Sequence, residues 1–488
     1  MRAGESAHVR EPNIHIAMNE MDISSAEFRG LAGRVAGIAS DYLEQLDSKP
    51  ISPATSGIEV EELFCEPLPE EGMGADALAK LAEVAKFSRV QNGRFFGYVL
   101  GSGDPVGAIA DFFASVLNQN VTAWRSGPAA VAIEQTVVRW LAEAVGCSAF
   151  TGHLTGGGSS ANLMGLAMAR ENRAAANETG IASKAVIYAS SEVHMSIPKS
   201  IALLGIGREN LRRIETDEAF RMLPERLEEA IRRDRDAGRL PIAVVGSAGT
   251  VSTGAIDPLA EIAQIARREG MWFHIDGAYG ALAAIADRAR FRGMELADSI
   301  SLDPHKWLYQ PLDCGCLLYR SAEAARQTFS HTGDYARSLN ADPVEGFAFF
   351  EESLELSRRF RALKLWLSLR YHGMAAFRAS IAKDMSQVRR LADAVRSEPR
   401  LELMAPVELS AVCFRYQGRD GLSEDERNAQ NLAILKRVVQ RGHVYLSNAS
   451  VRGKFCLRAC IVNHRTRDSD VDAVIPEVLD AAREIGAC

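Results

Sequence analysis

The chain has 488 residues, 47% of them hydrophobic, and a formal net charge of −7 from 56 basic and 63 acidic side chains. At roughly 150 residues per domain, this length predicts two to four domains with a sizeable core. Without a basic excess to neutralise phosphates, we expect no role on nucleic acid or on an acidic membrane surface. We also expect no membrane-spanning helix, because no apolar run reaches about 18 residues, and no signal peptide, because residues 1–20 are polar.

The eight cysteines are too few and too scattered for a disulfide scaffold. Several lie in apolar segments, so we expect reduced and mostly buried thiols in a cytoplasmic protein. Cys314 and Cys316, and likewise Cys456 and Cys460, lack the matching pairs of Cys or His that a zinc site requires. We therefore predict no metal.

Helical periodicity dominates the first part of the chain. Apolar residues recur at helical spacing over 25–48 and again over 75–88, with a loop between them. A loop rich in glycine and aromatic residues follows at 93–98, and then a clear amphipathic helix over 130–145. We interpret residues 1–100 as an N-terminal helical segment.

Strands and helices alternate in the middle of the chain. Short, continuous apolar strands are predicted at 185–189, 242–245, 271–275 and 315–319. Helical stretches separate them, among them 258–269. This pattern is typical of a buried, mostly parallel sheet covered by helices.

A second, smaller α+β region is predicted toward the C-terminus. A strongly helical stretch, 361–397, leads into it. Its predicted strands lie near 409–414, 444–447 and 455–462, and its predicted helices at 425–441 and 470–485. We predict a large α/β domain over 101–375 and a small C-terminal domain over 376–488.

Residues 154–162, Leu-Thr-Gly-Gly-Gly-Ser-Ser-Ala-Asn, lead into a helical stretch. Glycines allow close backbone approach, and the free N–H groups of a helix N-terminus together with hydroxyls can bind a phosphate. The segment lacks the Gly-Lys-Ser/Thr of a Walker loop and the G-x-G-x-x-G of a dinucleotide site. Taken alone, it could also be an ordinary glycine-rich turn.

Two further residues carry candidate chemistry. Asp276 ends an apolar strand, where α/β sheets bind ligands. Lys306 is flanked by His305 and Trp307, and desolvation favours a neutral lysine amine, which can form a Schiff base with an aldehyde. Taken alone, a strand-end aspartate and a surface lysine need no functional explanation.

The order of these three features along the chain predicts a pyridoxal 5'-phosphate (PLP) site. The cradle would hold the phosphate. Asp276 would keep the pyridine nitrogen protonated, and Lys306 would hold the aldehyde.

From about Phe95 to about Asp472, the sequence resembles the PLP-dependent group II decarboxylases, the family of aromatic-L-amino-acid, glutamate and 2,4-diaminobutyrate decarboxylases. The strongest motif is Asp-Pro-His-Lys-Trp at 303–307, which is similar to the family's Schiff-base segment. The resemblance implies an α/β, PLP-dependent transferase-like fold of type I with a mostly parallel sheet in its large domain. It also implies a homodimer in which residues 1–100 form a dimerisation segment.

The resemblance assigns roles to individual residues. The implied cofactor-binding residues are Gly158, Ser159, His194, Thr250, Asp276, Ala278, His305 and Lys306. His194, implied to stack on the cofactor ring, and Lys306 would also be catalytic. Without the resemblance, His194 would be interpreted as a core or surface histidine. The implied substrate-binding residues are Phe95 and Arg458.

Arg458 lies in an apolar strand, where an arginine needs an anionic partner. That partner could be the substrate carboxylate or an internal carboxylate.

Tyr335 matches the family's catalytic loop tyrosine by its position, 29 residues after Lys306. Such loops close over substrate, and the tyrosine would return a proton to the substrate carbon. A phenylalanine at this position would favour an aldehyde synthase, so the tyrosine favours a plain decarboxylase. The residues that flank Tyr335 match the family poorly, and an exposed loop tyrosine without a role is the alternative.

The predicted function is decarboxylation of an L-amino acid, a small-molecule substrate, to its amine and CO₂. The sequence does not select the amino acid. The alternatives are a decarboxylation-dependent aldehyde synthase, another fold-type I enzyme such as an aminotransferase, and a non-enzymatic binding protein in which the lysine is incidental.

Overall fold

The computed structural model describes residues 21–53, 55–181, 184–331 and 342–487. The chain forms two compact units, Met1–Val90 and Gln91–Cys488. No helix among the described residues is both long and apolar enough to cross a membrane.

The N-terminal unit is helical. It contains α1 (Ser25–Glu44), α2 (Gly57–Phe64) and α3 (Lys80–Phe87). Ser24 caps α1 by accepting a hydrogen bond from Glu27 N, and Ser56 with Glu59 forms a capping box on α2. None of these helices contains a buried residue, so their apolar positions stay largely exposed to water.

A seven-stranded sheet with the order β1-β7-β6-β5-β4-β2-β3 forms the centre of the second unit. Strands β3, β2, β4, β5 and β6 run parallel, and β7 is antiparallel to both β6 and β1. The prediction of a mostly parallel sheet is confirmed. Its strands are β1 (Thr151–Thr155), β2 (Ala185–Ser190), β3 (Leu211–Ile214), β4 (Leu240–Ser247), β5 (Trp272–Asp276), β6 (Ser299–Leu302) and β7 (Gly315–Tyr319).

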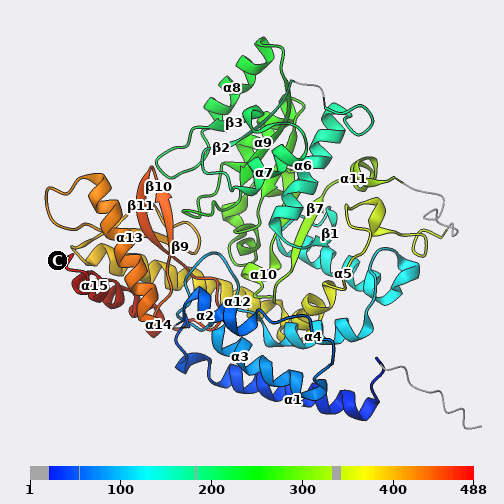
Figure 1. The fold of residues 1–488 in the computed structure, drawn as a ribbon. Helices are drawn as coiled ribbons and strands as arrows, with labels where there is room; N and C mark the ends of the chain where they lie inside the picture. The colour runs from blue at the N-terminus through cyan, green and yellow to red at the C-terminus, as the bar shows by residue number, and fades with distance from the viewer. Residues whose placement is uncertain (1–20, 54, 182–183, 332–341, 488) are drawn as a thin grey trace, which may run out of the picture. The chain divides into compact units, whose positions relative to one another are not determined.

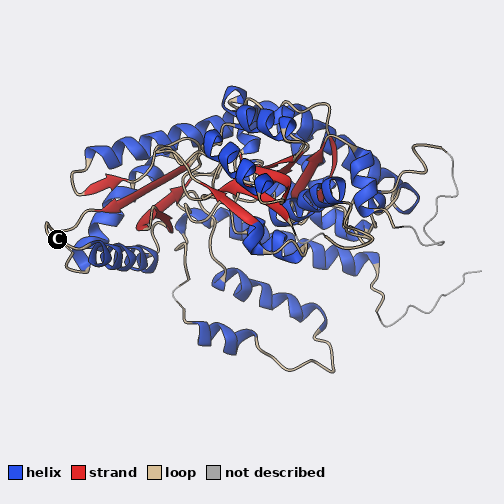
Figure 2. Cartoon of the chain, turned by 90° about the horizontal axis from the view of Figure 1, so that it is seen from above, coloured by secondary structure: helices blue, strands red, loops and turns tan. Residues whose placement is uncertain are grey.

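Helices cover this sheet, and its strands lie between helical layers (Figures 1 and 2). Helix α6 packs on β4, β5, β6 and β7, whereas α9 packs on β4 and β5 and α5 packs on β1. Because β2, β5, β6 and β7 are buried along their whole length, they carry near-continuous apolar or small side chains. The helices are α4 (Pro105–Leu117), α5 (Pro128–Ala144), α6 (Gly158–Ala174), α7 (Ser196–Leu203), α8 (Pro224–Asp236), α9 (Leu259–Arg268), α10 (Pro304–Trp307) and α11 (Ala322–Phe329).

A second, four-stranded antiparallel sheet has the order β10-β11-β9-β8 and its own apolar core. The predicted strand at 444–447 differs in detail: Tyr445 pairs with Phe95 in an isolated bridge, and the ladder with β11 begins only at Ser447. The elements of this region are α12 (Ala362–Ser397), β8 (Leu401–Leu403), β9 (Ala411–Tyr416), α13 (Glu424–Arg441), β10 (Ser447–Val451), β11 (Lys454–Cys460), α14 (Asp468–Asp472) and α15 (Val474–Glu484).

A buried ion pair joins three segments of the large sheet region. The Arg358 guanidinium lies 2.5 Å from the Glu134 carboxylate of α5, and both side chains are 1% exposed. Glu134 also accepts the Leu154 N–H of β1, and Arg358 donates to the Leu154 carbonyl. The two charged side chains therefore hold the backbone of Leu154 near the end of β1.

Candidate active site

A cavity of about 350 Å³ lies where β4, β5 and the β1–α6 connection end. Seven of the predicted site residues line it: Gly158, Ser159, His194, Asp276, Ala278, His305 and Lys306. Parallel strands place their carboxyl ends at one edge of a sheet, and this explains why residues far apart in sequence meet here.

The glycine-rich segment forms a tight cradle at the start of α6. Gly157 has φ 145°, a value that favours glycine. A Cβ atom on Gly158 would lie 2.5 Å from the Ala278 Cβ and 2.9 Å from Asp303 Oδ2, so only glycine fits. The first N–H groups of α6 have no intrahelical acceptor, and a helix N-terminus attracts anions. The cradle can therefore hold a phosphate.

Asp276 is the last residue of β5 and is 8% exposed. Its Oδ1 accepts hydrogen bonds from Ser301 Oγ and from the Ala278 N–H, both at 3.3 Å. These bonds orient a carboxylate at the cavity wall, where it can hold the proton of a ring nitrogen.

Lys306 lies in the one-turn helix α10, and its Nζ is 2.9 Å from Asp303 Oδ2. Asp303 is 3% exposed, and within the described part of the chain its Oδ1 has no hydrogen-bond partner. His305 Nδ1 donates to the Cys314 carbonyl at 2.7 Å, and its Nε2 lies 3.6 Å from Asp303 Oδ2. Burial lowers the pKa of His305. The Asp303 carboxylate thus holds the Lys306 amine inside the cavity.

The His194 ring is held in one tautomer. Its Nδ1 accepts the Ser196 backbone N–H at 3.3 Å and lies 2.9 Å from Ser196 Oγ. An accepting Nδ1 leaves the proton on Nε2. Burial and the nearby charge of Lys306 lower the pKa of His194, although Asp276 opposes them. The ring is therefore neutral near pH 7.

A chain of hydrogen bonds extends from His194 into the core. Asn162 Nδ2 donates to Ser196 Oγ at 3.0 Å, and Asn162 Oδ1 lies 2.9 Å from His274 Nε2. His274 Nδ1 in turn lies 2.8 Å from Ser299 Oγ, which accepts the Trp272 indole N–H. Burial lowers the pKa of His274 to about 3, so its ring is neutral. Its Nε2 donates to the Asn162 amide oxygen, which only accepts, and its Nδ1 therefore accepts the Ser299 hydroxyl proton. Ser196, which accepts from Asn162, presents its own hydroxyl proton to His194.

Thr250, Phe95 and Arg458 do not line the cavity. Thr250 Oγ1 accepts the Ala255 N–H and lies 3.0 Å from Thr253 Oγ1, so it stabilises the loop that places Val251 at the cavity. Phe95 is buried and stacks on Tyr445 with ring centroids 4.9 Å apart.

Arg458, 6% exposed, reaches the edge of the site indirectly. It donates through Nη1 to the Val251 carbonyl and through Nε to Ser447 Oγ. Among the described residues no carboxylate lies within ion-pair distance of it. The internal salt bridge considered from sequence is therefore not seen in this part of the chain. Tyr335 lies outside the described residues.

The sequence did not reveal a role for Asp303, nor did it reveal the buried hydrogen-bonded pair of Tyr309 and Asp384. Tyr309 OH donates to Asp384 Oδ2 at 2.9 Å, and the same oxygen accepts the Asn463 N–H at 3.1 Å. Asp384 is fully buried and has no cation in contact among the residues described here. Burial raises its pKa to about 7. Polar residues inside apolar helical or strand patterns, such as Asp384 and His274, were the signal that could have revealed these contacts.

No group of three or more His, Cys, Asp or Glu side chains in the described chain is arranged to hold a metal ion. The seven described cysteines are free thiols, and six of them are buried.

The fold and this cavity define a pyridoxal-phosphate enzyme of fold type I. The family model for the pyridoxal-dependent decarboxylase conserved domain matches residues 69–417. The chain therefore belongs to the pyridoxal-dependent decarboxylases, and its cofactor is PLP. The cradle that only glycine fits and the unpartnered Asp303 oxygen beside Lys306 are consistent with a bound group at this position.

The chain is similar along its length to known enzymes. It is 33% identical to an aromatic-L-amino-acid decarboxylase of Bacillus atrophaeus over 95% of this chain and 97% of that protein. It is 29% identical to a phenylacetaldehyde synthase of Petunia hybrida over 89% and 90%. The crystal structure of Oryza sativa TDC with PLP and tryptamine superposes with a TM-score of 0.89 at 26% identity, covering 96% of this chain and 99% of that chain.

The ionisation of Asp384 makes a testable contribution to stability. Its raised pKa means that the folded state holds a proton which the unfolded state releases above about pH 4. The stabilisation is complete below that pH and is lost as the pH rises toward 7. Asp384→Asn keeps an acceptor for Tyr309 and carries no charge. We expect its advantage in free energy of unfolding over the wild type to grow by up to about 4 kcal/mol between pH 4 and 8.

Denaturant unfolding across that pH range measures the difference. Asp393→Asn, at an exposed position of the same helix, is the matched control and should show a nearly constant difference. A constant difference for Asp384→Asn as well would contradict the assignment.

Proposed function

We propose that this enzyme decarboxylates an aromatic L-amino acid to the corresponding arylalkylamine and CO₂. The observation that carries the proposal is the convergence of the phosphate cradle, Asp276, His194 and Lys306 on one cavity. The aromatic class is supported by the 33% identity to the Bacillus atrophaeus aromatic-L-amino-acid decarboxylase.

Bound PLP supplies an electron sink that accepts the bonding electrons of the departing carboxylate. Each cavity residue then has a separate task. The start of α6, with Gly158 and Ser159, binds the phosphate, and His305 supports it. Asp276 keeps a proton on the ring nitrogen, and Ala278 leaves room beside it. The neutral His194 ring would stack on the cofactor ring.

Lys306 and Asp303 work as a pair. Lys306 would hold the cofactor aldehyde. Its amine has a carboxylate partner 2.9 Å away in Asp303. Because Asp303 is almost completely buried, the amine is held in the cavity and away from bulk water.

We assign supporting roles at the rim. Arg458 donates to the Val251 carbonyl at the cavity edge and is our candidate for binding the substrate carboxylate, and Thr250 stabilises the same loop. Phe95, stacked on Tyr445, supports the wall on the side of Val99. In this proposal the substrate is bound with its carboxylate toward Arg458.

We further propose a cytoplasmic homodimer. The α4 face carries exposed Ile109, Phe112, Phe113 and Val116, with 49–65% of each side chain accessible. An apolar patch of this kind is typical of a protein interface. Helices α1, α2 and α3 also contain no buried residue within one chain, which supports a role for the N-terminal segment in dimerisation.

A substrate panel tests the proposed reaction. The purified holoenzyme is incubated with L-tryptophan, L-tyrosine, L-phenylalanine, L-glutamate and L-2,4-diaminobutyrate, and CO₂ and amine are quantified. We expect equimolar CO₂ and amine from at least one aromatic substrate, at a rate well above the rates with L-glutamate and L-2,4-diaminobutyrate. Faster turnover of glutamate or diaminobutyrate would contradict the aromatic class, and keto-acid formation without CO₂ would indicate an aminotransferase.

Tyr335 decides between two outcomes of the same cleavage. The relatives include aldehyde synthases, such as the Petunia hybrida enzyme. We propose that the Tyr335 hydroxyl returns the proton to the substrate carbon, so the wild type forms amine. Tyr335→Phe removes the acid, and we expect amine formation to fall by roughly 10²-fold or more while aldehyde, ammonia and oxygen consumption appear. Unchanged amine formation would show that Tyr335 has no such role, and Tyr371→Phe, at an exposed tyrosine of α12, is the control.

A further inference from the structure

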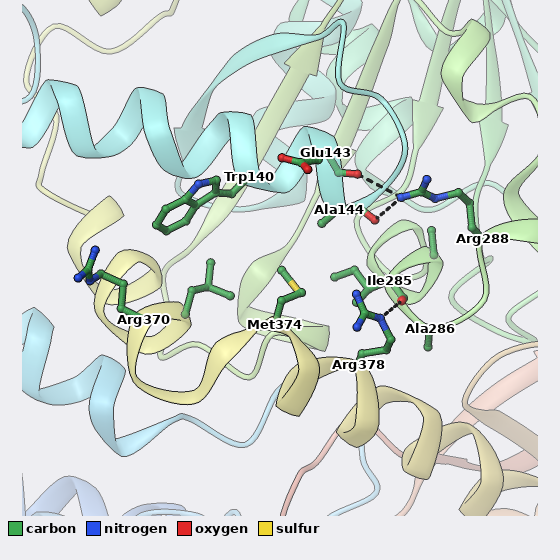
Figure 3. A pocket seen from close by; sticks show the side chains of 11 residues that line it. Trp140, Glu143, Ala144, Ile285, Ala286, Arg288, Arg370, Met374 and Arg378 are labelled. Atoms are coloured by element: carbon green, nitrogen blue, oxygen red, sulfur yellow. Dashed lines mark hydrogen bonds between the residues drawn. The ribbon is translucent and has the colours of Figure 1, made fainter.

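A second and larger cavity lies away from the cofactor site. Its volume is about 750 Å³, within the roughly 300–1,000 Å³ typical of small-molecule pockets. It is bordered by the end of α5, by the 3-10 helix Ala281–Ile285 and by the middle of α12 (Figure 3). None of its lining residues belongs to the cofactor cavity.

The floor of this cavity is apolar and partly aromatic. Trp140, Ile285, Leu369 and Met374 form it, and Figure 3 shows Trp140, Met374 and Ile285 side by side across its width. Helix α12 is kinked at Gly373, which has φ 75° and ψ 151°, directly before Met374. A planar ring fits such a floor, because indole and thioether groups make favourable contacts with aromatic faces.

Three arginines surround the floor, and they are held in place without being neutralised. Arg288 donates to the carbonyls of Glu143 and Ala144, and Arg378 donates through Nε to the Ile285 carbonyl. Arg370 stacks over the Trp366 ring. In the part of the chain that the structure covers, none of the three guanidinium groups has a carboxylate within 4 Å.

The charge balance of the cavity selects the ligand. Against three arginines, the lining contains a single carboxylate, Glu143. The remaining guanidinium N–H groups can pair with a planar carboxylate in bidentate geometry. The same charges repel a cationic amine, and the amino group of a zwitterion would weaken the attraction.

We propose that this cavity is a binding site for an aromatic carboxylate that lacks an amino group. Its ring lies on Trp140 and Met374, its carboxylate pairs with Arg378, and the charges of Arg288 and Arg370 add to the attraction. The site is distinct from the catalytic one, and it distinguishes acids from the amines that the proposed reaction forms.

The probe for this site is 2-naphthoate, titrated calorimetrically into the full-length holoenzyme. The size-matched cation 2-naphthylmethylamine is titrated in parallel. We expect 2-naphthoate to bind with one site per chain and to lose affinity as salt is added, and we expect no comparable binding of the amine. Arg378→Gln and Arg370→Gln should each weaken the binding about tenfold or more. Arg389→Gln, at an exposed position of α12 outside the cavity, should leave it unchanged.

The cofactor absorbance band and circular dichroism verify that each variant is folded and loaded. Since Arg370 is exposed and has no hydrogen bond in the described chain, its variant tests the site even if Arg378→Gln fails to fold. Equal affinity in the wild type and both arginine variants would overturn the proposal. So would amine binding as tight as naphthoate binding. Absence of naphthoate binding to the wild type would also overturn it, including the case in which a second copy of the chain covers the cavity.

Discussion

The carboxylate of Asp303 is the interaction on which the catalytic cavity depends. It is 3% exposed, lies 2.9 Å from Lys306 Nζ and borders the glycine cradle so closely that Gly158 has no room for a Cβ atom. A buried carboxylate without a cation is very costly. The Asp303 carboxylate therefore requires a cation, and its pairing with Lys306 holds the lysine beside the cradle.

A second set of polar contacts fixes the opposite wall. The hydrogen-bond chain from Trp272 through His274 and Asn162 to Ser196 has one direction, because the Asn162 oxygen can only accept and the neutral His274 ring has a single proton to donate. It ends by leaving the His194 ring neutral with its proton on Nε2. The Tyr309–Asp384 hydrogen bond links the segment that follows Lys306 to α12, and Asp384 also binds the N–H of Asn463, which follows β11. These buried networks hold the side chains that chemistry requires in fixed rotamers.

The sequence was sufficient for the fold class and for the residues whose chemistry is unusual in their surroundings. Continuous apolar strands such as 185–189 and 271–275 predicted the parallel sheet, because a strand buried on both faces has no polar alternation. Lys306, Asp276 and Gly158 could be singled out because each belongs to a local pattern: a lysine between His and Trp, an aspartate at the end of an apolar strand, and a glycine-rich segment before a helix. Strands β1, β3, β6 and β8 were not predicted. All residues of β1 and β6 except Thr151 are buried, but the polar residues in Thr-Gly-His-Leu-Thr and Ser-Ile-Ser-Leu are typical of exposed segments. Their burial depends on partners such as Trp272 and Tyr319, which are distant in sequence.

Contacts between distant segments limited the site prediction in the same way. Tyr309 and Asp384 are separated by 75 residues, so no local pattern could pair them. Arg458 was expected to need an anion, whereas in the described chain it is held by the Val251 carbonyl and Ser447. Neutral acceptors can satisfy a guanidinium at a cavity edge, and periodicity cannot reveal them. The arginine-lined cavity likewise combines α5, α12 and the segment after β5, which only the folded chain brings together.

The central claim is that Lys306 holds the cofactor in this cavity. Reduction of the PLP-loaded enzyme with borohydride, followed by proteolysis and mass spectrometry, identifies the lysine that carries it. The account predicts that the peptide containing Lys306 gains the mass of the reduced cofactor. It also predicts that Lys306→Ala loses both this adduct and the absorbance band near about 420 nm. An adduct on a different lysine, or an unchanged band in Lys306→Ala, would contradict the account.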